Sequence, residues 1–318
     1  MLNWAIKTAG EITSRPHGVS LWLRLSYIAR WDGANWSDLS GPGGTGMNGW
    51  VQALTVHDDH LIAGGGFTQA GGQIVNNIAR WDGDSWSSLS GPDGTGMSHT
   101  VRALTVHDGE LIAGGHFSEA GGKTVNNVAA WDGLDWSGLS GPGGTGVNGP
   151  VIVLAVHGSE LIAGDHFSEA GGQTVNYVAS WNGVDWSGLD GPDGTGVDEA
   201  VCGLAVHDGD LIAGGAFVQA GGQTVNRIAR WDGISWSDLS GPDDTGTNDA
   251  VFAFADFNGD LMAGGRFSTA GGQPAARMGA WRREATMTEM LRVEPNQADI
   301  GDTVLVEARS QGPVSAPD

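Results

Sequence analysis

Lysine is almost absent from this sequence, because it occurs only as Lys7 and Lys123. The chain carries 37 acidic residues against 15 lysines and arginines, which gives a formal net charge of −22. A field of that sign repels phosphate backbones and anionic membrane surfaces, so we expect no nucleic-acid partner. An acidic surface suits salty surroundings and also a calcium-rich exterior, and the composition leaves both open.

Cysteine and long apolar runs are scarce as well. Cys202 is the single cysteine, which excludes a disulfide within the chain, and we expect its side chain to pack in a strand. No stretch reaches the roughly 18 apolar residues that a membrane helix needs, so we expect no insertion into a membrane. Lys7, Glu11 and Arg15 lie where a signal peptide would carry its apolar run, and no targeting signal is visible.

Glycine and tryptophan, by contrast, are abundant, with 55 and 14 copies. They fall in an internal repeat of 50 residues, in which the segments 51–57, 61–65 and 81–83 return four or five times. A Gly-Pro pair closes each unit at 41, 91, 141, 191 and 241. Self-similarity at a fixed period of this length is the signature of a repeat architecture.

Each unit predicts four short strands separated by turn signals. In one copy the expected strands are 101–106, 111–115, 127–131 and 136–139. Asp-Gly pairs follow the first and the third strand, as tight hairpins require, and a longer loop joins the second strand to the third. Four antiparallel strands make one propeller blade, so the predicted fold class is all-β, a β-propeller of four-stranded blades.

The copies predict five blades over residues 26–283. Residues 26–40 supply strands three and four, residues 51–250 supply four complete units, and residues 251–281 supply strands one to three. Joining the ends gives five blades with one spare third strand. We expect the N-terminal pair to complete the last blade, which removes the exposed sheet edge.

Two tryptophans per unit form a pattern that accounts for eleven of the fourteen. They would serve either as a ligand-stacking ladder or as packing between blades, and recurrence in nearly every copy favours packing. Burial of one tryptophan contributes at most about 4–6 kcal/mol. The predicted structural tryptophans are Trp31, Trp36, Trp81, Trp86, Trp131, Trp136, Trp181, Trp186, Trp231, Trp236 and Trp281.

These residues carry a family resemblance. The order of apolar strand, Gly-Gly, loop, Trp81-Asp82, turn and Trp86 resembles kelch and galactose-oxidase-like propeller repeats, which usually have Tyr-Asp at that point. It is still more similar to the repeats of Rax2-like and bacterial surface propellers, which read Ala-Gly-Gly-x-Phe and Trp-Asp-Gly-x-x-Trp. The resemblance covers about 26–283. It implies the architecture but says little about function, because propellers host many unrelated activities. We expect a secreted or cell-surface protein.

The two ends depart from the repeat. Residues 1–25 form a non-repeat segment, which we interpret either as a truncated start or as a cap of unrelated sequence. Residues 284–318 read as a linker followed by the first strands of an Ig-like module. We therefore expect a monomeric propeller within a larger protein.

No catalytic or metal-binding constellation stands out. His57, His107, His157 and His207 recur in the first hairpin of successive blades, and we expect a role local to each hairpin rather than metal binding. An oxidase-type copper site requires clustered tyrosine, histidine and cysteine, whereas this chain has only two tyrosines in repeated strands. Asp93, Asp193 and Asp243 give one carboxylate per Gly-Pro loop, too few for strong Ca²⁺ binding. We expect no cofactor.

The remaining functional classes are a binding or adhesion module, a structural scaffold on the cell surface or outside the cell, and an enzyme (oxidase or glycan-active) with an unrecognised site. Positions before strand one, after strand two and at the start of strand three differ between otherwise similar copies, which is typical either of a contact surface or of drift. We predict a non-catalytic module with a protein or glycan partner. The predicted contact residues are Trp50, His116, His166, Tyr177, Arg227 and Arg266.

Overall fold

The structure is a computed structural model that describes residues 4–5, 27–41, 44, 46–192, 194–239 and 246–281. Its regular elements over these residues are all strands. In this part of the chain no helix is long and apolar enough to cross a membrane. The expected Ig-like start at 284–318 and most of the segment 1–25 lie outside the described residues.

Four complete antiparallel sheets repeat along the chain, each with four strands in sequence order. The first blade has β4 (Trp50–His57), β5 (His60–Gly66), β8 (Ile78–Trp81) and β9 (Trp86–Ser88). The second has β12 (Val101–His107), β13 (Glu110–Gly115), β16 (Val128–Trp131) and β17 (Trp136–Gly138). The third has β20 (Val153–His157), β21 (Glu160–Gly164), β24 (Val178–Trp181) and β25 (Trp186–Gly188). The fourth has β28 (Val201–His207), β29 (Asp210–Gly215), β32 (Ile228–Trp231) and β33 (Trp236–Asp238).

Two incomplete sheets flank these blades. The fifth blade has three described strands, β34 (Val251–Phe257), β35 (Asp260–Gly265) and β38 (Met278–Trp281). At the other end, β2 (Ala29–Trp31) and β3 (Trp36–Asp38) form a hairpin, and β1 (Trp4–Ala5) pairs with β2. The all-β prediction and the four-stranded blades are therefore confirmed.

Short two-residue ladders decorate the connections. Inside the loop from strand two to strand three they are β6 (Gln69–Ala70) with β7 (Gln73–Ile74), β14 (Glu119–Ala120) with β15 (Lys123–Thr124), β22 (Glu169–Ala170) with β23 (Gln173–Thr174), β30 (Gln219–Ala220) with β31 (Gln223–Thr224), and β36 (Thr269–Ala270) with β37 (Gln273–Pro274). Between blades they are β10 (Ser90–Gly91) with β11 (Gly94–Thr95), β18 (Ser140–Gly141) with β19 (Gly144–Thr145), and β26 (Asp190–Gly191) with β27 (Gly194–Thr195).

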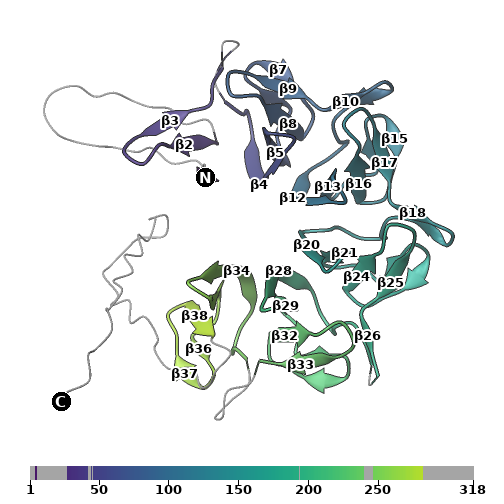
Figure 1. The fold of residues 1–318 in the computed structure, drawn as a ribbon, viewed down its shortest axis with the longest axis vertical. Helices are drawn as coiled ribbons and strands as arrows, with labels where there is room; N and C mark the ends of the chain where they lie inside the picture. Colours follow the sequence, from purple (N-terminus) through teal and green to yellow (C-terminus); the bar gives the residue numbers. More distant parts are fainter. Residues whose placement is uncertain are drawn as a thin grey trace, which may run out of the picture.

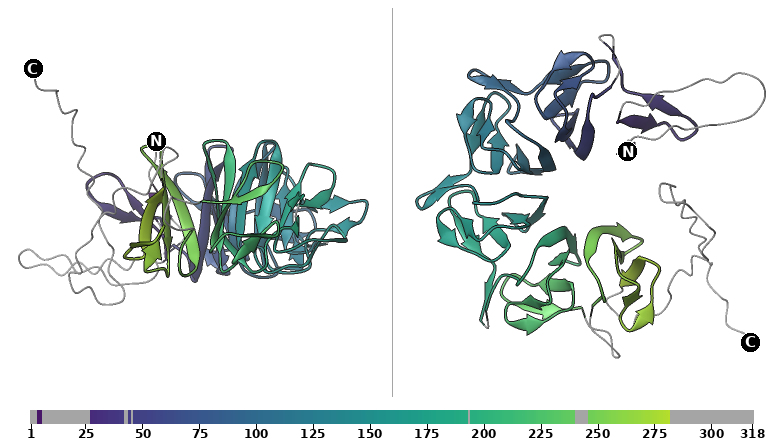
Figure 2. Two further views of the ribbon diagram at one scale, coloured as in Figure 1. Left: turned by 90° about the horizontal axis from the view of Figure 1, so that it is seen from below. Right: turned by 180° about the vertical axis from the view of Figure 1, so that it is seen from behind.

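The blades stand side by side around a central space, with β4, β12, β20, β28 and β34 innermost (Figure 1). The ring is open, because the β2–β3 hairpin and the fifth blade lie at opposite ends of the arc in both face-on views (Figure 2). The expectation that the N-terminal pair completes the last blade is not met in this structure, since β38 pairs with β35 and β2 pairs with β1. The number of blades in a closed ring stays a prediction.

Aspartate and glycine set the hairpins as the sequence predicted. Asp108 and Gly109 both have positive φ, at +50° and +83°, which is the backbone of a two-residue hairpin turn. In the second hairpin of the blade, Asp132 Oδ1 accepts hydrogen bonds from the backbone N–H groups of Leu134 and Asp135, both at 2.8 Å. These turns return the chain at the same end of every blade.

The second tryptophan of each repeat unit packs and hydrogen-bonds against the preceding blade. Trp136 is fully buried, and its Nε1 donates to the carbonyl oxygen of Leu89 in the preceding blade at 3.1 Å. Trp86, Trp186 and Trp236 make the same bond to Leu39, Leu139 and Leu189. The first tryptophan stacks against the second at 5.2–5.5 Å between ring centroids.

The recurring histidines join blades rather than single hairpins, so the expectation of a local role is wrong. His57 Nε2 donates to the carbonyl oxygen of Gly109, His107 Nε2 to that of Ser159, and His157 Nε2 to that of Gly209, each at 2.9 Å. Each bond spans 52 residues and reaches the first hairpin of the next blade. His207 differs, because its Nδ1 lies 3.0 Å from Asp256 Oδ2.

Candidate functional site

The three variable positions of each blade meet at one end of its sheet. In the second blade the N–H of His116 donates to the carbonyl of Thr100 at 3.0 Å, and the N–H of Gly115 donates to the carbonyl of Asn127 at 2.9 Å. The same contacts recur in the fourth and fifth blades. We call this edge the variable rim; it consists of positions 50, 66 and 77 and their equivalents at intervals of 50 residues.

The predicted contact residues all lie on the variable rim, but only two of them touch. The rings of His166 and Tyr177 meet edge to face, with centroids 5.2 Å apart. Trp50 is 63% exposed at the start of β4, and His116 faces His99 at 5.3 Å. Arg227 Nη1 donates to the carbonyl of Ala216, and Arg266 Nε lies 3.9 Å from Asp249 Oδ2. The remaining residues are therefore distributed over different blades.

The third rim position demands a left-handed backbone. Asn77 and Asn127 have φ of +69° and +62° there, and the Nδ2 of each donates at 2.9 Å to a carbonyl of the following linker. Asparagine tolerates this conformation, whereas other L-residues pay about 1–2 kcal/mol for it. Tyr177, Arg227 and Arg277 adopt it with φ of +60°, +72° and +65°. These three blades thus carry less favourable residues than asparagine at the same place.

The third blade departs from the repeat where Asp165 replaces the second glycine of Ala-Gly-Gly. A Cβ atom added to Gly215, the equivalent residue of the fourth blade, would clash with the carbonyl oxygen of Ala200. The third blade lacks the equivalent pairing: β20 begins only at Val153, whereas β28 begins at Val201, two positions earlier in the repeat, although the Ile152 N–H still donates to the Gly164 carbonyl at 3.2 Å. Asp165 itself has a φ of +154°.

Several titratable groups lie near Asp165. Burial raises the pKa of Asp165 to about 6, although His166 and Arg102 oppose the shift with their charges. His166 Nδ1 lies 3.7 Å from Glu199 Oε1, and both side chains are largely exposed. Burial, together with the charges of Asp165 and Glu199, raises the pKa of the Cys202 thiol. The site thus presents two carboxylates, an imidazole and a phenol on an open edge.

Sequence reasoning identified His166 and Tyr177 but missed Asp165, Glu199 and Arg102. The usable signal was the single replacement of a glycine that every other copy keeps at positions 65, 115, 215 and 265. Glu199 and Arg102 gave no such signal, because the residues at their positions differ between most copies.

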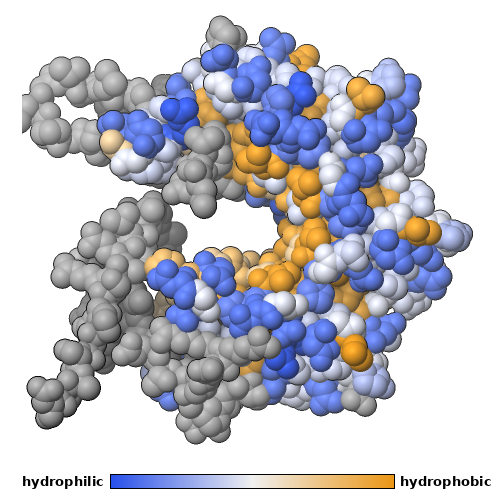
Figure 3. Space-filling view, viewed as in Figure 1, coloured by the Kyte–Doolittle hydropathy of each residue, from blue (hydrophilic) through white to orange (hydrophobic). Residues whose placement is uncertain are grey.

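The centre of the arc is apolar. The inner strands line an open cavity of about 670 Å³, with Leu54, Leu104, Leu154 and Phe254 among its lining residues. Hydrophobic side chains accordingly gather around the central opening in the space-filling view (Figure 3). The variable rim lies at the start of these inner strands and so borders one mouth of the cavity.

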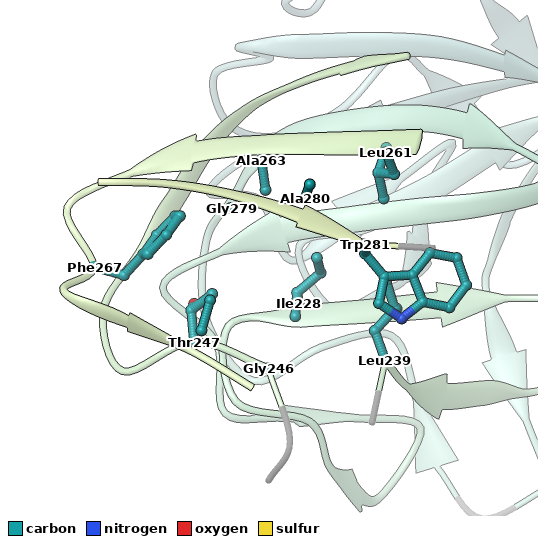
Figure 4. Close-up of a pocket in the computed structure, with 11 residues that line it drawn as sticks. Ile228, Leu239, Gly246, Thr247, Leu261, Ala263, Phe267, Gly279, Ala280 and Trp281 are labelled. Carbon is teal, nitrogen blue, oxygen red and sulfur yellow. The ribbon is translucent and has the colours of Figure 1, made fainter. Parts of the chain in front are cut away.

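A smaller apolar pocket separates the fourth and fifth blades (Figure 4). Leu239, Gly279 and Trp281 are among its lining residues. In other blades the second tryptophan bonds to the residue equivalent to Leu239, but position 286, where the repeat would place that tryptophan, is threonine. The pocket therefore belongs to blade packing and carries no polar lining suited to chemistry.

Within the part of the chain that the structure describes, no group of three or more histidine, cysteine, aspartate or glutamate residues is arranged to hold a metal ion. Asp93 belongs to that part, whereas Asp193 and Asp243 lie outside it. Folding without a metal therefore stays a prediction.

Comparison with known proteins supports the fold. Residues 207–231 match a family model described as a domain of unknown function (DUF5122) β-propeller. The chain has a β-propeller fold. The match spans the first hairpin and third strand of the fourth blade. No curated protein sequence matches.

Two solved structures resemble this chain with low sequence identity and low TM-scores. One is the computationally designed Ika8 protein, at 16% identity and a TM-score of 0.39, covering 74% of this chain and 76% of that one. The other is the extracellular domain of a protein described as a one-component system from B. thetaiotaomicron, at 13% identity and a TM-score of 0.39. The alignment covers 76% of this chain but only 35% of that protein.

Proposed function

We propose that this chain is a non-catalytic β-propeller module that binds a protein partner through its variable rim. The observation that carries the proposal is the set of unfavourable residues at this edge. Asp165 lies where β20 pairs two residues less than the equivalent strand of the fourth blade, and Tyr177 and Arg227 hold a left-handed backbone where asparagine serves two other blades. Residues that cost stability persist at functional sites, where contact with a partner compensates them.

The charges of the rim favour an extended partner of mixed charge. Asp165 and Glu199 add negative charge beside the rim of the third blade, whereas Arg227, Arg266 and Arg277 add positive charge to the rim of the fourth and fifth blades. A protein surface can carry both positive and negative charges across several blades, and pairing of opposite charges would set the partner's orientation. Tyr177 and Trp50 supply the aromatic contacts that protein interfaces favour.

Binding fits the site better than catalysis. His166 and Glu199 are 65% and 49% exposed, so water reaches both groups freely. Acid–base chemistry gains most where a closed site excludes water and holds its groups in fixed geometry. The open edge instead resembles a contact surface.

We also place the module outside the cell or on its surface, as adhesion domain or scaffold. This part of the proposal rests on the likeness of the repeat to those of surface propellers. It predicts that the chain, expressed from its native gene, is digested by protease added to intact cells. Full protection until the cells are lysed would contradict it.

The binding proposal is tested with an array of extracellular proteins and glycans probed by the purified chain. A six-residue variant, with Trp50, His116, His166, Tyr177, Arg227 and Arg266 changed to alanine, is probed in parallel. The matched control changes Leu134, Val184 and Ile234 to alanine; these residues are 80%, 68% and 76% exposed in the outer hairpins, at the opposite end of the strands.

We expect a protein partner whose affinity falls at least ten-fold in the rim variant and stays unchanged in the control. A glycan ligand with the same dependence would keep the site and change the partner class. A partner that binds the rim variant as tightly as the unmodified chain would overturn the proposal.

A further inference from the structure

Each interior blade packs one face against the preceding blade and a different face against the following blade. The first and last sheets of the arc therefore expose different faces. Ile62 and Ile78 of the first blade pack in one core with Val101, Trp131 and Trp136 of the second. We call the side of a blade that carries the isoleucines its forward face, because it packs on the following blade. The side that carries the tryptophans is the rear face. The third and fourth blades repeat the arrangement.

Among the residues that the structure describes, none covers the forward face of the fifth blade. Met278 is 42% exposed, whereas the equivalent residues Ile78, Val128, Val178 and Ile228 are at most 5% exposed. A Cβ atom added to Gly264 meets nothing within 4 Å, although the equivalent Gly64, Gly114, Gly164 and Gly214 each abut a valine of the next blade. Apolar surface of this kind marks an interaction site.

The described part of the chain likewise leaves the rear face of the β2–β3 hairpin without a covering blade. Trp31 and Trp36 are each 36% exposed, whereas Trp131, Trp136, Trp231 and Trp236 are at most 8% exposed. Their rings lie 5.4 Å apart at 45°, close to the geometry of the buried pairs. The hairpin therefore presents the tryptophan pair of the surface that interior blades bury, in nearly the same geometry.

The two uncovered faces do not meet within one chain. Ile28 and Leu39 fix the hairpin to the first blade, where both are 2% exposed, and Trp86 Nε1 donates to the Leu39 carbonyl at 2.7 Å. The fifth blade lies across the gap in the arc (Figures 1 and 2). A second copy can bring its hairpin to the forward face without any change in either chain.

We propose that copies of this chain associate head to tail, with Trp31 and Trp36 of one copy packed on Met262 and Met278 of another. The contact repeats the pairing of forward and rear faces inside the chain. Methionine suits such a face because its flexible side chain adapts to a partner ring. The contact joins unlike surfaces, so it is heterologous and builds closed rings or open filaments. It departs from the monomer expected from the sequence, leaves the variable rim free and does not rest on the binding proposal.

The test measures mass by light scattering and sedimentation from about 1 to 200 µM, a range that covers weak and moderate association. Trp31→Glu removes the rear face and Met278→Glu removes the forward face; both residues are partly exposed, so we expect folding to persist. Trp50→Glu is the matched control, because Trp50 is an exposed tryptophan of the rim.

We expect the unmodified chain and the Trp50→Glu variant to associate, and each end variant alone to stay monomeric. An equimolar mixture of the two end variants should then form a dimer and nothing larger, because one intact rear face meets one intact forward face. This complementation also shows that both variants are folded. An unmodified chain that stays monomeric, association that survives either end change, or a mixture that fails to dimerise would each overturn the proposal.

Discussion

Replacing Asp165 with glycine restores the repeat at the point where the third blade departs from it. Asp165 has a φ of +154° and blocks the pairing that Val201 makes with Gly215 in the fourth blade. Its pKa is raised to about 6 because the carboxylate is half buried. Asp165→Gly removes the Cβ clash, lets β20 begin two residues earlier and removes a charge from a poorly solvated position.

The expected gain at pH 7.5 is about 1–1.5 kcal/mol. A pKa raised from 3.8 to about 6 corresponds to roughly 3 kcal/mol at 1.36 kcal/mol per unit, which we reduce to about 1 kcal/mol because half of the group meets solvent. Recovered strand pairing adds about 1 kcal/mol. The greater freedom of glycine in the unfolded chain subtracts about 0.5–1 kcal/mol.

The direction in which Asp165 changes the folding stability with pH follows from its raised pKa. The folded state holds the Asp165 proton more tightly than the unfolded state, so this group destabilises the protein as the pH rises from about 3.8 through 6. The gain from Asp165→Gly should therefore be larger at pH 7.5 than at pH 5. Urea midpoints followed by tryptophan fluorescence at the two pH values measure it.

Asp165→Asn is the control for this prediction, because it removes the charge and keeps the Cβ atom. It should recover the pH-dependent part of the gain and none of the strand pairing. A glycine variant less stable than the unmodified chain at pH 7.5, or a gain that does not change with pH, would refute the reasoning.

Three further predictions concern repeated positions. Arg227→Asn should raise stability by about 1 kcal/mol, because asparagine suits the left-handed backbone, and Asn127→Arg should lower it by a similar amount or more, both read from urea midpoints. Trp136→Ala should cost about 3–5 kcal/mol and lower the thermal midpoint, because it opens a cavity between blades and removes the Trp136 hydrogen bond to the Leu89 carbonyl, which keeps only its bond from the Gly96 N–H at 3.3 Å. Hydrogen bonds from the N–H groups of Leu134 and Asp135 lower the pKa of Asp132, so its stabilising effect should fade as the pH falls below 3.8. Asp132→Asn should keep the turn, as Asn182 does in the third blade, and lose that part of the acid sensitivity in denaturation between pH 5 and 2.

The sequence predicted most of the blade because each strand has a local signal. The expected strands 101–106 and 111–115 correspond to β12 and β13, and the Asp-Gly turns between them have the predicted backbone. The two-residue ladders of the loops were not predicted. Pairs such as β14 and β15 are too short to show an alternating pattern, so glycine and polar residues gave only a loop signal.

Contacts between blades were harder to predict, because periodicity says which residues are equivalent but not what they face. His57 looked like part of its own hairpin, yet its partner is the carbonyl of Gly109 in the next blade. The strand order alone predicts that the three rim positions meet at one end of the blade. The shorter pairing beside Asp165 could not be predicted from the sequence, because it depends on where a carbonyl of the neighbouring strand lies. The open arc also differs from the expected closure, because ring curvature depends on packing that no single repeat encodes.

Hydrogen exchange of the chain with and without its saturating protein partner tests the central claim most directly, since it locates the contact surface without any substitution. We predict slower exchange in the rim segments 165–177 and 216–227, which include Asp165, His166, Tyr177 and Arg227. The outer hairpins at 132–135 and 182–185 should exchange at unchanged rates. Protection confined to those outer hairpins, with the rim unaffected, would contradict the assignment of the variable rim as the binding site.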